Sequence, residues 1–419
     1  MSNDRIIVTS QQPHFIPIIK LLAAKDFKFM ALDPTFTKTL ADLDLPAAPI
    51  SQATEGLGDA AIAETLKILN AAQRPLNGKG IPAPIKQFVE KGLPIYLYTK
   101  IADLAMLALA LDRVKPEVIM VHNDVEPVLR CVALWAKHNN VPCLHIPHAI
   151  YQDVNRGGPG TDVHDLITAS HLASAGHFQT AWYRARGFPA QNIRETGMPQ
   201  FDEWAKMLPD RNKARRALGL DNSRPVVVYA STWPQATNLA GIHDEWAVSY
   251  LRFLEAMRKM PEIQPIIKLH PRAGQDNFNW HGQKAKEAGV DCLLTAIHNQ
   301  FIFNAADLVL AYGGSNVLFE AAHVPWVRLM TTHGYIDDPE VEKVAIDGMT
   351  DAIQASLARP IVDTLPLRFK YLGVPDGKAS ERIAGFIEEL ANAKNKVHRH
   401  PKSGKRSQAV PAELQQVPG

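Results

Sequence analysis

Cysteine is scarce in this chain, whose 419 residues include only three. Cys131, Cys143 and Cys292 show none of the spacings of a metal site, and all three stand in apolar segments. Thiols in such surroundings are expected to be buried and reduced. This excludes a disulfide scaffold and favours a reducing compartment.

An excess of one charge and long apolar runs are also missing. The 45 basic residues nearly balance 43 acidic ones, so the composition does not indicate a generally basic surface for nucleic acid. No uncharged apolar run reaches about 18 residues, and no secretion signal precedes the strand-like segment 6–9. We therefore expect a cytoplasmic protein without a transmembrane segment, long enough for two domains.

The chain does contain a repeated alternation of short apolar runs and amphipathic stretches. Alternation of this kind is typical of parallel α/β sheets. It occurs twice, and a basic segment with Pro and Gly, 208–225, separates the two occurrences. The expected strands are Arg5–Thr9, Phe27–Leu32, Val118–His122, Cys143–Ile146, Leu166–Ala169, Val226–Tyr229, Pro265–Leu269, Cys292–Leu294 and Leu308–Ala311.

The pattern predicts an α/β protein with two Rossmann-like, doubly wound parallel-sheet domains that face each other across a cleft. The first domain covers residues 1–208 and the second 209–375, followed by a helix over 376–395. The basic tail 396–419 is expected to be disordered, because its hydrophobicity is low and its charges are clustered. Contact of this tail with nucleic acid is the less favoured alternative.

One segment of the second half combines several features of a phosphate site. A strand-like run ends in Gly313 and Gly314 and leads through Ser315 and Asn316 into a helical pattern. Glycines let the backbone approach a ligand closely, and the free N–H groups at a helix start attract phosphate. Glu320, one helical turn after Asn316, could accept hydrogen bonds from a ribose. An ordinary strand–turn–helix connection explains the same residues, so both interpretations stay open here.

Two further strand ends of the second half favour the phosphate interpretation. Ser231 and Thr232 follow one strand, and Lys268, His270 and Arg272 surround the end of the next. Hydroxyl groups, loop amides and cationic side chains all bind phosphate oxygens. Since the ends of parallel strands meet at one edge of a sheet, these residues together predict a nucleotide-diphosphate site.

The strand ends of the first half carry candidate catalytic groups. His14 lies in the loop after the first strand, and His148 follows the strand 143–146. Imidazole titrates near neutral pH, so either histidine could deprotonate a hydroxyl. Asp124 precedes a helix and is a third candidate, although Asp124 and His14 also suit capping roles. The histidines and carboxylates show no metal-ligand spacing, and no metal is expected.

These motifs resemble the GT-B superfamily, which includes nucleotide-sugar glycosyltransferases, UDP-N-acetylglucosamine 2-epimerases and CDP-glycerol glycerophosphotransferases. The loop 13–17 is similar to the first loop of many of these transferases, where a histidine is often the base. The segment 121–145 resembles the epimerase layout. The segments 268–271 and 314–320 resemble the glycerophosphotransferase and capsule-polymer branch, where they hold the donor's phosphates. Glu320 matches the ribose-binding glutamate of other GT-B enzymes.

The departures from these branches are informative. In the epimerases a catalytic carboxylate follows the strand after the Asp124-like position, and here Pro147 stands there. Epimerisation needs acid–base groups at a carbon, so this loss argues against it. In the glycerophosphotransferases a His-Gly pair follows the same strand, whereas Ala149 follows His148 here. Their Thr-Asp-Tyr-Ser-Ser turn is replaced over residues 311–315.

The resemblance implies a metal-independent glycosyltransferase of polysaccharide biosynthesis without a resident cofactor. It would move a sugar from a nucleotide-sugar donor, UDP- or CDP-linked, to a hydroxyl acceptor such as a glycan or a lipid-linked molecule. The first domain would bind the acceptor and the second the donor. The alternatives are a glycerophosphotransferase of the CDP-glycerol type, an epimerase-like isomerase, a nucleic-acid-modifying glycosyltransferase and a non-catalytic sugar- or nucleotide-binding protein.

Overall fold

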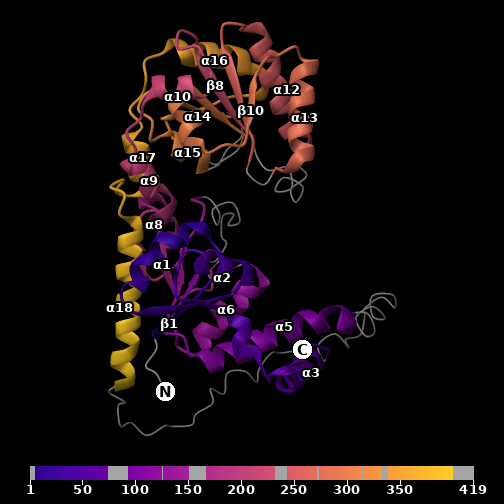
Figure 1. Ribbon diagram of the computed structural model, residues 1–419, viewed down its shortest axis with the longest axis vertical. Coiled ribbons are helices and arrows are strands. Elements are labelled where there is room, and N and C mark those ends of the chain that lie inside the picture. The colour runs from indigo at the N-terminus through magenta and orange to yellow at the C-terminus, as the bar shows by residue number, and fades with distance from the viewer. Residues whose placement is uncertain are drawn as a thin grey trace.

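The computed structural model describes residues 5–73, 93–124, 126–150, 167–231, 243–270, 273–312, 316–332 and 338–399. These residues form two α/β domains, which Figure 1 shows one above the other. Each domain contains one parallel sheet with helices packed around it, so the predicted fold class is confirmed.

The first domain is built on a seven-stranded parallel sheet with the order β3-β2-β1-β4-β5-β6-β7. Its middle strand β4 is apolar and buried along its whole length, because a parallel sheet is covered on both faces. The strands are β1 Arg5–Thr9, β2 Phe27–Ala31, β3 Ala47–Pro49, β4 Val118–Val121, β5 Cys143–His145, β6 His171–Ser174 and β7 Ile193–Glu195. The helices that accompany them are α1 Ile16–Ala23, α2 Pro34–Ala41, α3 Gly58–Gln73, α5 Leu93–Val114, α6 Pro127–His138 and α8 His177–Ala185, with the 3-10 helices η1 Pro13–Phe15, η2 Ile50–Thr54 and η5 Ala190–Asn192.

The second domain has a six-stranded parallel sheet with the order β10-β9-β8-β11-β12-β13. The strands are β8 Val226–Ala230, β9 Gln264–Lys268, β10 Leu293–Thr295, β11 Leu308–Ala311, β12 Arg328–Thr331 and β13 Val341–Lys343. The chain reaches this domain through η6 Pro199–Phe201, α9 Asp202–Lys206 and α10 Arg211–Ala217. Its other helices are α12 His243–Lys259, α13 Gly274–Glu287, α14 Asn299–Ala305, α15 Asn316–Ala321, α16 Met349–Ala358 and α17 Leu365–Leu372, with the 3-10 helix η8 Ile346–Gly348.

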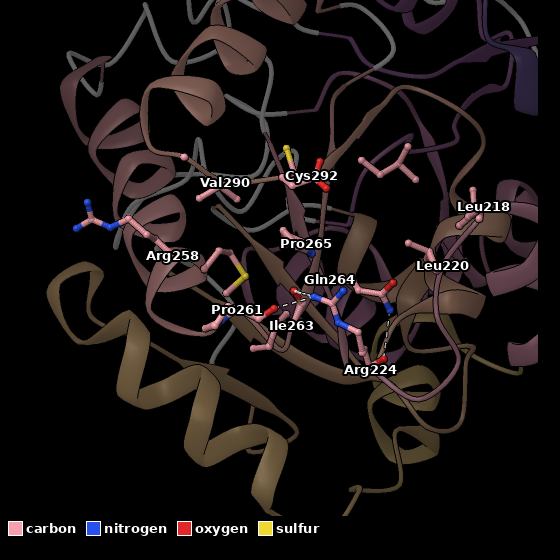
Figure 2. A pocket seen from close by; sticks show the side chains of 15 residues that line it. Leu218, Leu220, Arg224, Arg258, Pro261, Ile263, Gln264, Pro265, Val290 and Cys292 are labelled. Carbon is pink, nitrogen blue, oxygen red and sulfur yellow. Dashed lines mark hydrogen bonds between the residues drawn. The ribbon is translucent and has the colours of Figure 1, made fainter.

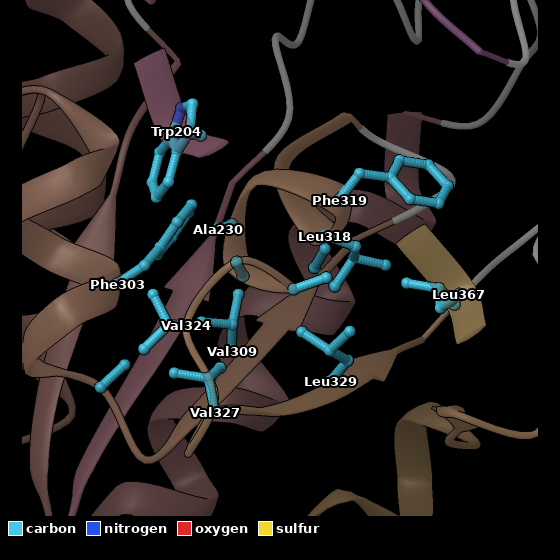
Figure 3. Packing of buried hydrophobic residues seen from close by; sticks show 14 of the residues in the cluster. Trp204, Ala230, Phe303, Val309, Leu318, Phe319, Val324, Val327, Leu329 and Leu367 are labelled. Carbon is cyan, nitrogen blue, oxygen red and sulfur yellow. The ribbon is translucent and has the colours of Figure 1, made fainter. Parts of the chain in front are cut away.

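An apolar cluster packs against helix α15 and extends to the connection between the domains. Leu318 and Phe319 of α15 belong to one buried cluster with Val309 of β11, and Figure 3 shows residues of this cluster. Trp204 of the connecting helix α9 belongs to the same cluster and stacks on Phe303, with ring centroids 6.1 Å apart. The start of α15 therefore has a defined place relative to the connection.

The last helix, α18 Ala379–Arg399, returns from the second domain to the first. Figure 1 shows it running along the first domain beside α1. Its apolar side, which includes Ile383 and Ile387, packs against Phe15 and Ile18 next to the first strand. The helix continues to Arg399 and so extends past residue 396, where the tail was expected to begin; residues 400–419 lie outside the described part of the chain.

One predicted strand is wrong. The pattern places a strand over Leu166–Ala169, but residues 167–169 have no strand structure and the strand is β6, His171–Ser174. The backbone N–H groups of Thr168 and Ala169 donate to the carboxylate of Asp124 instead of to a neighbouring strand. The apolar residues Ile167 and Ala169 are therefore buried, as expected, but they precede strand β6 and do not pair with a strand of the sheet.

Among the helices of the described ranges, none combines the length and the hydrophobicity needed to cross a bilayer.

The free energy of unfolding is expected to fall as the pH decreases below 6.5, because two buried histidines stay neutral in the folded protein. Burial lowers the pKa of His281 and of His323 from 6.5 to about 4. Between these values the unfolded chain binds protons that the folded chain does not bind. Each histidine should then contribute a slope of about 1.4 kcal/mol per pH unit. Urea unfolding measured across this pH range checks the slope.

The variant His323→Asn provides the control, because an asparagine amide can still donate to the carbonyl of Phe319 that His323 Nδ1 contacts at 2.9 Å. Its unfolding free energy should depend less steeply on pH than that of the wild type. An equal slope in both proteins would show that His323 does not titrate between the two states.

Candidate functional site

A cavity of about 890 Å³ lies between the two domains at the carboxyl ends of their strands. Four predicted site residues line it: His14 and His148 from the first domain, and Asn316 and Glu320 from the second. In doubly wound sheets, ligands bind at this end, where the strand order reverses. The reversal occurs between β1 and β4 in one sheet and between β8 and β11 in the other.

His14 is a neutral imidazole at the wall of this cavity. It follows β1 in the 3-10 helix η1, and the neighbouring Phe15 anchors this turn because its side chain is completely buried. The Nε2 atom of His14 is buried and has no hydrogen-bond partner among the described residues. Burial, and then the nearby His148 and His122, lower the pKa of His14 to about 3. Its charged form is therefore strongly disfavoured at neutral pH.

His148 and His122 lie beside His14. The rings of His122 and His148 meet edge to face, with centroids 5.5 Å apart. Nδ1 of His122 is 2.9 Å from the hydroxyl of Ser10, which also accepts the backbone N–H of His122 at 3.2 Å. The three histidines thus follow three neighbouring strands, β1, β4 and β5. The sequence did not single out His122, although its position directly after a strand beside β1 is a signal for this place.

Asn316 connects the two domains. Its Nδ2 donates to the carbonyl of His148 at 2.8 Å, and its Oδ1 accepts the backbone N–H of Ile150 at 3.3 Å. Gln200 in η6 also lines the cavity, and its Nε2 donates to the same carbonyl at 3.1 Å. The sequence did not predict Gln200, because the partner of its side chain lies 52 residues away.

Glu320 and Lys268 carry opposite charges in the second domain, and Glu320 is half-buried while Lys268 is buried. Glu320 accepts a hydrogen bond from the amide of Asn299. Burial raises the pKa of Glu320, while the bond to Asn299 and the charge of Lys268 lower it. Lys268 donates to the carbonyl of Leu269 at 2.6 Å, and burial lowers its pKa against the influence of Glu320. Glu320 lines the cavity, whereas Lys268 is not among the lining residues. His270 is half-buried and follows the end of β9.

Ser231 does not line the cavity; its hydroxyl is used inside the second domain. It accepts the indole N–H of Trp246 at 3.2 Å and lies 3.1 Å from Nε2 of His281. Nδ1 of His281 is 2.7 Å from the carbonyl of Asn277 and can only donate to it, so Nε2 of the neutral ring accepts from Ser231. This arrangement favours a structural role for Ser231 over the predicted contact with the donor.

Asp124 does not line the cavity either. Its side chain is 1% exposed, and Oδ2 accepts the backbone N–H groups of Thr168 and Ala169, the latter at 2.7 Å. Oδ1 lies 4.0 Å from Nδ1 of His145, which is buried as well. The structure thus places this predicted catalytic residue where it holds the segment that leads into β6.

Five predicted site residues cannot be placed. Thr232, Arg272, Gly313, Gly314 and Ser315 lie outside the described residues. Within the described ranges, no three His, Cys, Asp or Glu side chains form a group that could hold a metal ion.

A second cavity, of about 480 Å³, lies at the opposite edge of the second sheet. Its lining residues stand before β8, β9 and β10, and Figure 2 shows Arg224, Gln264 and Cys292 among them. Arg224 donates to the carbonyls of Pro261 and Glu262 and so holds the loop in front of β9. Because ligands of doubly wound sheets bind at the carboxyl ends, this cavity is not part of the candidate site.

Comparison with known proteins supports both the fold and the predicted resemblance. Residues 161–312 match the family described as CDP-Glycerol:Poly(glycerophosphate) glycerophosphotransferase. No curated protein sequence matches the chain significantly.

Several solved structures are similar over almost the whole chain. They include the UDP-GlcNAc 2-epimerase of Methanocaldococcus jannaschii in complex with UDP-GlcNAc and UDP, with a TM-score of 0.54, 15% identity and coverage of 92% of this chain and 99% of that one. A putative UDP-N-acetylglucosamine 2-epimerase from Listeria monocytogenes gives a TM-score of 0.54, 12% identity and coverage of 93% and 97%. The UDP-GlcNAc 2-epimerase of Neisseria meningitidis bound to UDP-GlcNAc gives a TM-score of 0.51 and 14% identity. The match covers 92% of this chain and 99% of that one.

Identities this low establish the fold alone, and the fold is GT-B. The similarity to the glycerophosphotransferase branch and to the epimerases, which the sequence motifs indicated, is confirmed. The chain therefore consists of two Rossmann-like domains with a cavity between them.

The variant Asp124→Ala is expected to lower the free energy of unfolding by about 3 kcal/mol, because it leaves two buried N–H groups without an acceptor. Asp124→Asn keeps a side-chain oxygen for these groups and should lose less. Urea unfolding measures both values. Asp112→Ala is the control, since the exposed bond of Asp112 to the indole of Trp135 should be worth about 1 kcal/mol. Equal values for Asp124→Ala and Asp112→Ala would contradict the structural role of Asp124.

Proposed function

We propose that this chain transfers a group from a nucleotide-diphosphate donor to a hydroxyl acceptor in the cavity between its domains. One observation carries the proposal: His14 and His148 of the first domain line the same cavity as Asn316 and Glu320 of the second. A base from one domain and donor-side groups from the other are thus within one ligand-sized space. The family match over residues 161–312 supports a transferase.

The first domain supplies the base for the acceptor hydroxyl, and the pKa of His14 argues against His14 in this role. A general base works best when its pKa is near the operating pH. The pKa of His14, about 3, makes it a weak base, so it serves as a neutral hydrogen-bonding group for the acceptor. His148 lies at the cavity beside it and takes the proton as the hydroxyl oxygen attacks.

The second domain holds the donor. Glu320, which lines the cavity from α15, is the group for the ribose. Lys268 is the last residue of strand β9 and His270 follows it, and we expect their N–H groups to stabilise the charge that develops on the leaving group. Arg272 and the segment Gly313–Ser315 complete this proposed donor site.

The transferred group is a sugar in the first form of the proposal. The bond between the sugar carbon and the diphosphate oxygen breaks, the acceptor oxygen bonds to that carbon, and the nucleoside diphosphate leaves. The second form is transfer of a polyol phosphate from a CDP-linked donor, which the glycerophosphotransferase match favours. Here the acceptor oxygen bonds to the phosphorus that carries the polyol, the bond from this phosphorus to the oxygen bridging the two phosphates breaks, and the nucleoside monophosphate leaves.

The leaving nucleotide distinguishes these forms. The protein is incubated with UDP- and CDP-linked sugars and with CDP-glycerol, with and without a glycan or lipid-linked acceptor, and the released nucleotides are separated. Release of UDP or CDP that depends on the acceptor supports sugar transfer, and release of CMP from CDP-glycerol supports the second form. A new nucleotide sugar formed without an acceptor would show an epimerase, and nucleotide binding without any reaction would show a binding protein.

The variant His148→Ala is expected to lower the transfer rate by about 10²- to 10⁴-fold, the usual contribution of a general base. His14→Ala should cost about tenfold, because it removes one hydrogen bond to the acceptor. Single-turnover rates with saturating donor measure both. His177→Ala, an exposed histidine at the start of α8, should react like the wild type. A larger loss in His14→Ala than in His148→Ala would reverse the assignment of the base.

Transfer is expected to proceed without a divalent metal, because cationic side chains and backbone N–H groups stabilise the leaving phosphate. The rate should therefore be unchanged after dialysis against a chelator. Activity that is lost on chelation and restored by magnesium or manganese would contradict this part of the proposal.

A further inference from the structure

The side chain of Asn316 forms a hydrogen-bonded bridge between the domains. Asn316 is the first residue of α15 in the second domain, and both of its polar ends bond the backbone of the loop after β5 in the first. Its amide nitrogen donates to His148 and its oxygen accepts from Ile150. An amide has one donor end and one acceptor end, so the two bonds together determine its orientation.

The same loop is held from the first domain as well. Nε2 of Gln200 donates to the carbonyl of His148 at 3.1 Å, and Nε2 of Gln179 donates to that of Ile150 at 3.4 Å. The side chain of Ile150 is completely buried in the apolar cluster that contains Leu318 and Phe319 of α15. The loop is therefore a contact between the domains, in which Asn316 supplies the polar contact from the second domain.

These bonds constrain the backbone at His148 from two sides. The carbonyl of His148 accepts hydrogen bonds from both Asn316 and Gln200, so the peptide plane next to the imidazole has a defined direction. A displacement of a reacting group by about 1 Å can cost about 100-fold in rate. The position of this backbone therefore determines how well the imidazole meets a bound hydroxyl.

We propose that Asn316 is a positioning residue that joins the donor-side helix α15 to the loop of His148, so that the base is in place only when the two domains are closed. This inference rests on the proposed function, in which His148 is the base. It also changes the role expected for Asn316 from its sequence: its amide holds the acceptor-side loop instead of a donor phosphate.

Two variants separate these roles. Asn316→Ala removes both bonds, and Asn316→Asp keeps an oxygen for the N–H of Ile150 but loses the donor to His148. Asn304→Ala is the matched control, because Asn304 is a buried amide of the same domain that donates to Gln300 at 2.9 Å and does not line the cavity.

If Asn316 acts through His148, kcat should fall by about 10- to 100-fold in both Asn316 variants. The dissociation constants of UDP and CDP should stay within about twofold of the wild type, since a lost positioning contact affects the reaction more than ground-state binding. Asn304→Ala should keep both the kcat and the nucleotide dissociation constants of the wild type. An affinity for nucleotide that falls about tenfold in Asn316→Ala would show a phosphate contact and overturn the proposal.

A double-variant cycle tests the connection to the base. In a His148→Ala background, Asn316→Ala should cost no further activity, because the group that it positions is already absent. Losses that multiply would show that Asn316 acts independently of His148 and would overturn the inference.

Hydrogen exchange gives a result that does not require activity. Amide exchange measured by mass spectrometry should become faster at Ile150 in Asn316→Ala and stay slow in Asn304→Ala. Asn316→Asp should protect Ile150 at least partly. If the wild type transfers no group from any donor, the proposed function fails, and exchange still decides whether the bridge exists. Unchanged exchange in Asn316→Ala would show that it does not.

Discussion

The rest of the structure depends on the contact between the segment that enters the second domain and the segment that returns from it. In the first domain, the turn between β6 and α8 also lies against the returning chain, since a Cβ atom on Gly176 would be 2.6 Å from the nitrogen of Gly373. Just beyond, the carboxylate of Asp202 accepts the N–H groups of Ala379 and Ser380 at 2.8 and 2.9 Å and so caps α18. The chain that enters the second domain is thereby joined to the chain that leaves it.

This joint explains why the carboxyl ends of two separate sheets can form one cavity. Helix α18 starts at the joint and packs its apolar side against α1 and Phe15, directly beside His14. Helix α15 is attached to the same joint through its cluster with Phe201 and Trp204. The cavity-lining histidines of the first domain and the cavity-lining residues of the second are therefore positioned by one set of packed contacts. A change of angle between the domains would separate them, which is why a polar bridge such as that of Asn316 affects both sides.

The fold could largely be predicted because central parallel strands are apolar along their whole length. β8 and β11 consist of such runs, and the predicted ranges agree with the structure to within a residue. Edge strands were missed where this signal is absent, as in β3, which is three residues long and contains a proline. The false strand over 166–169 has another cause. Asp124, 44 residues earlier in the chain, supplies the acceptor for Thr168, and a local pattern does not contain a contact of that range.

The sequence could predict which residues of the site lie at the strand ends, but it could not predict which of them are available to a ligand. Residue type and position brought His14, His148, Asn316 and Glu320 to one cavity, because parallel strands place their carboxyl ends at one edge. Whether a polar group at that edge is available to a ligand depends on partners from distant segments. The hydroxyl of Ser231 is taken by a histidine 50 residues away, and the amide of Asn316 by a loop 168 residues away. A buried polar group that already has its partners gains little from a ligand, so availability is a property of the folded chain.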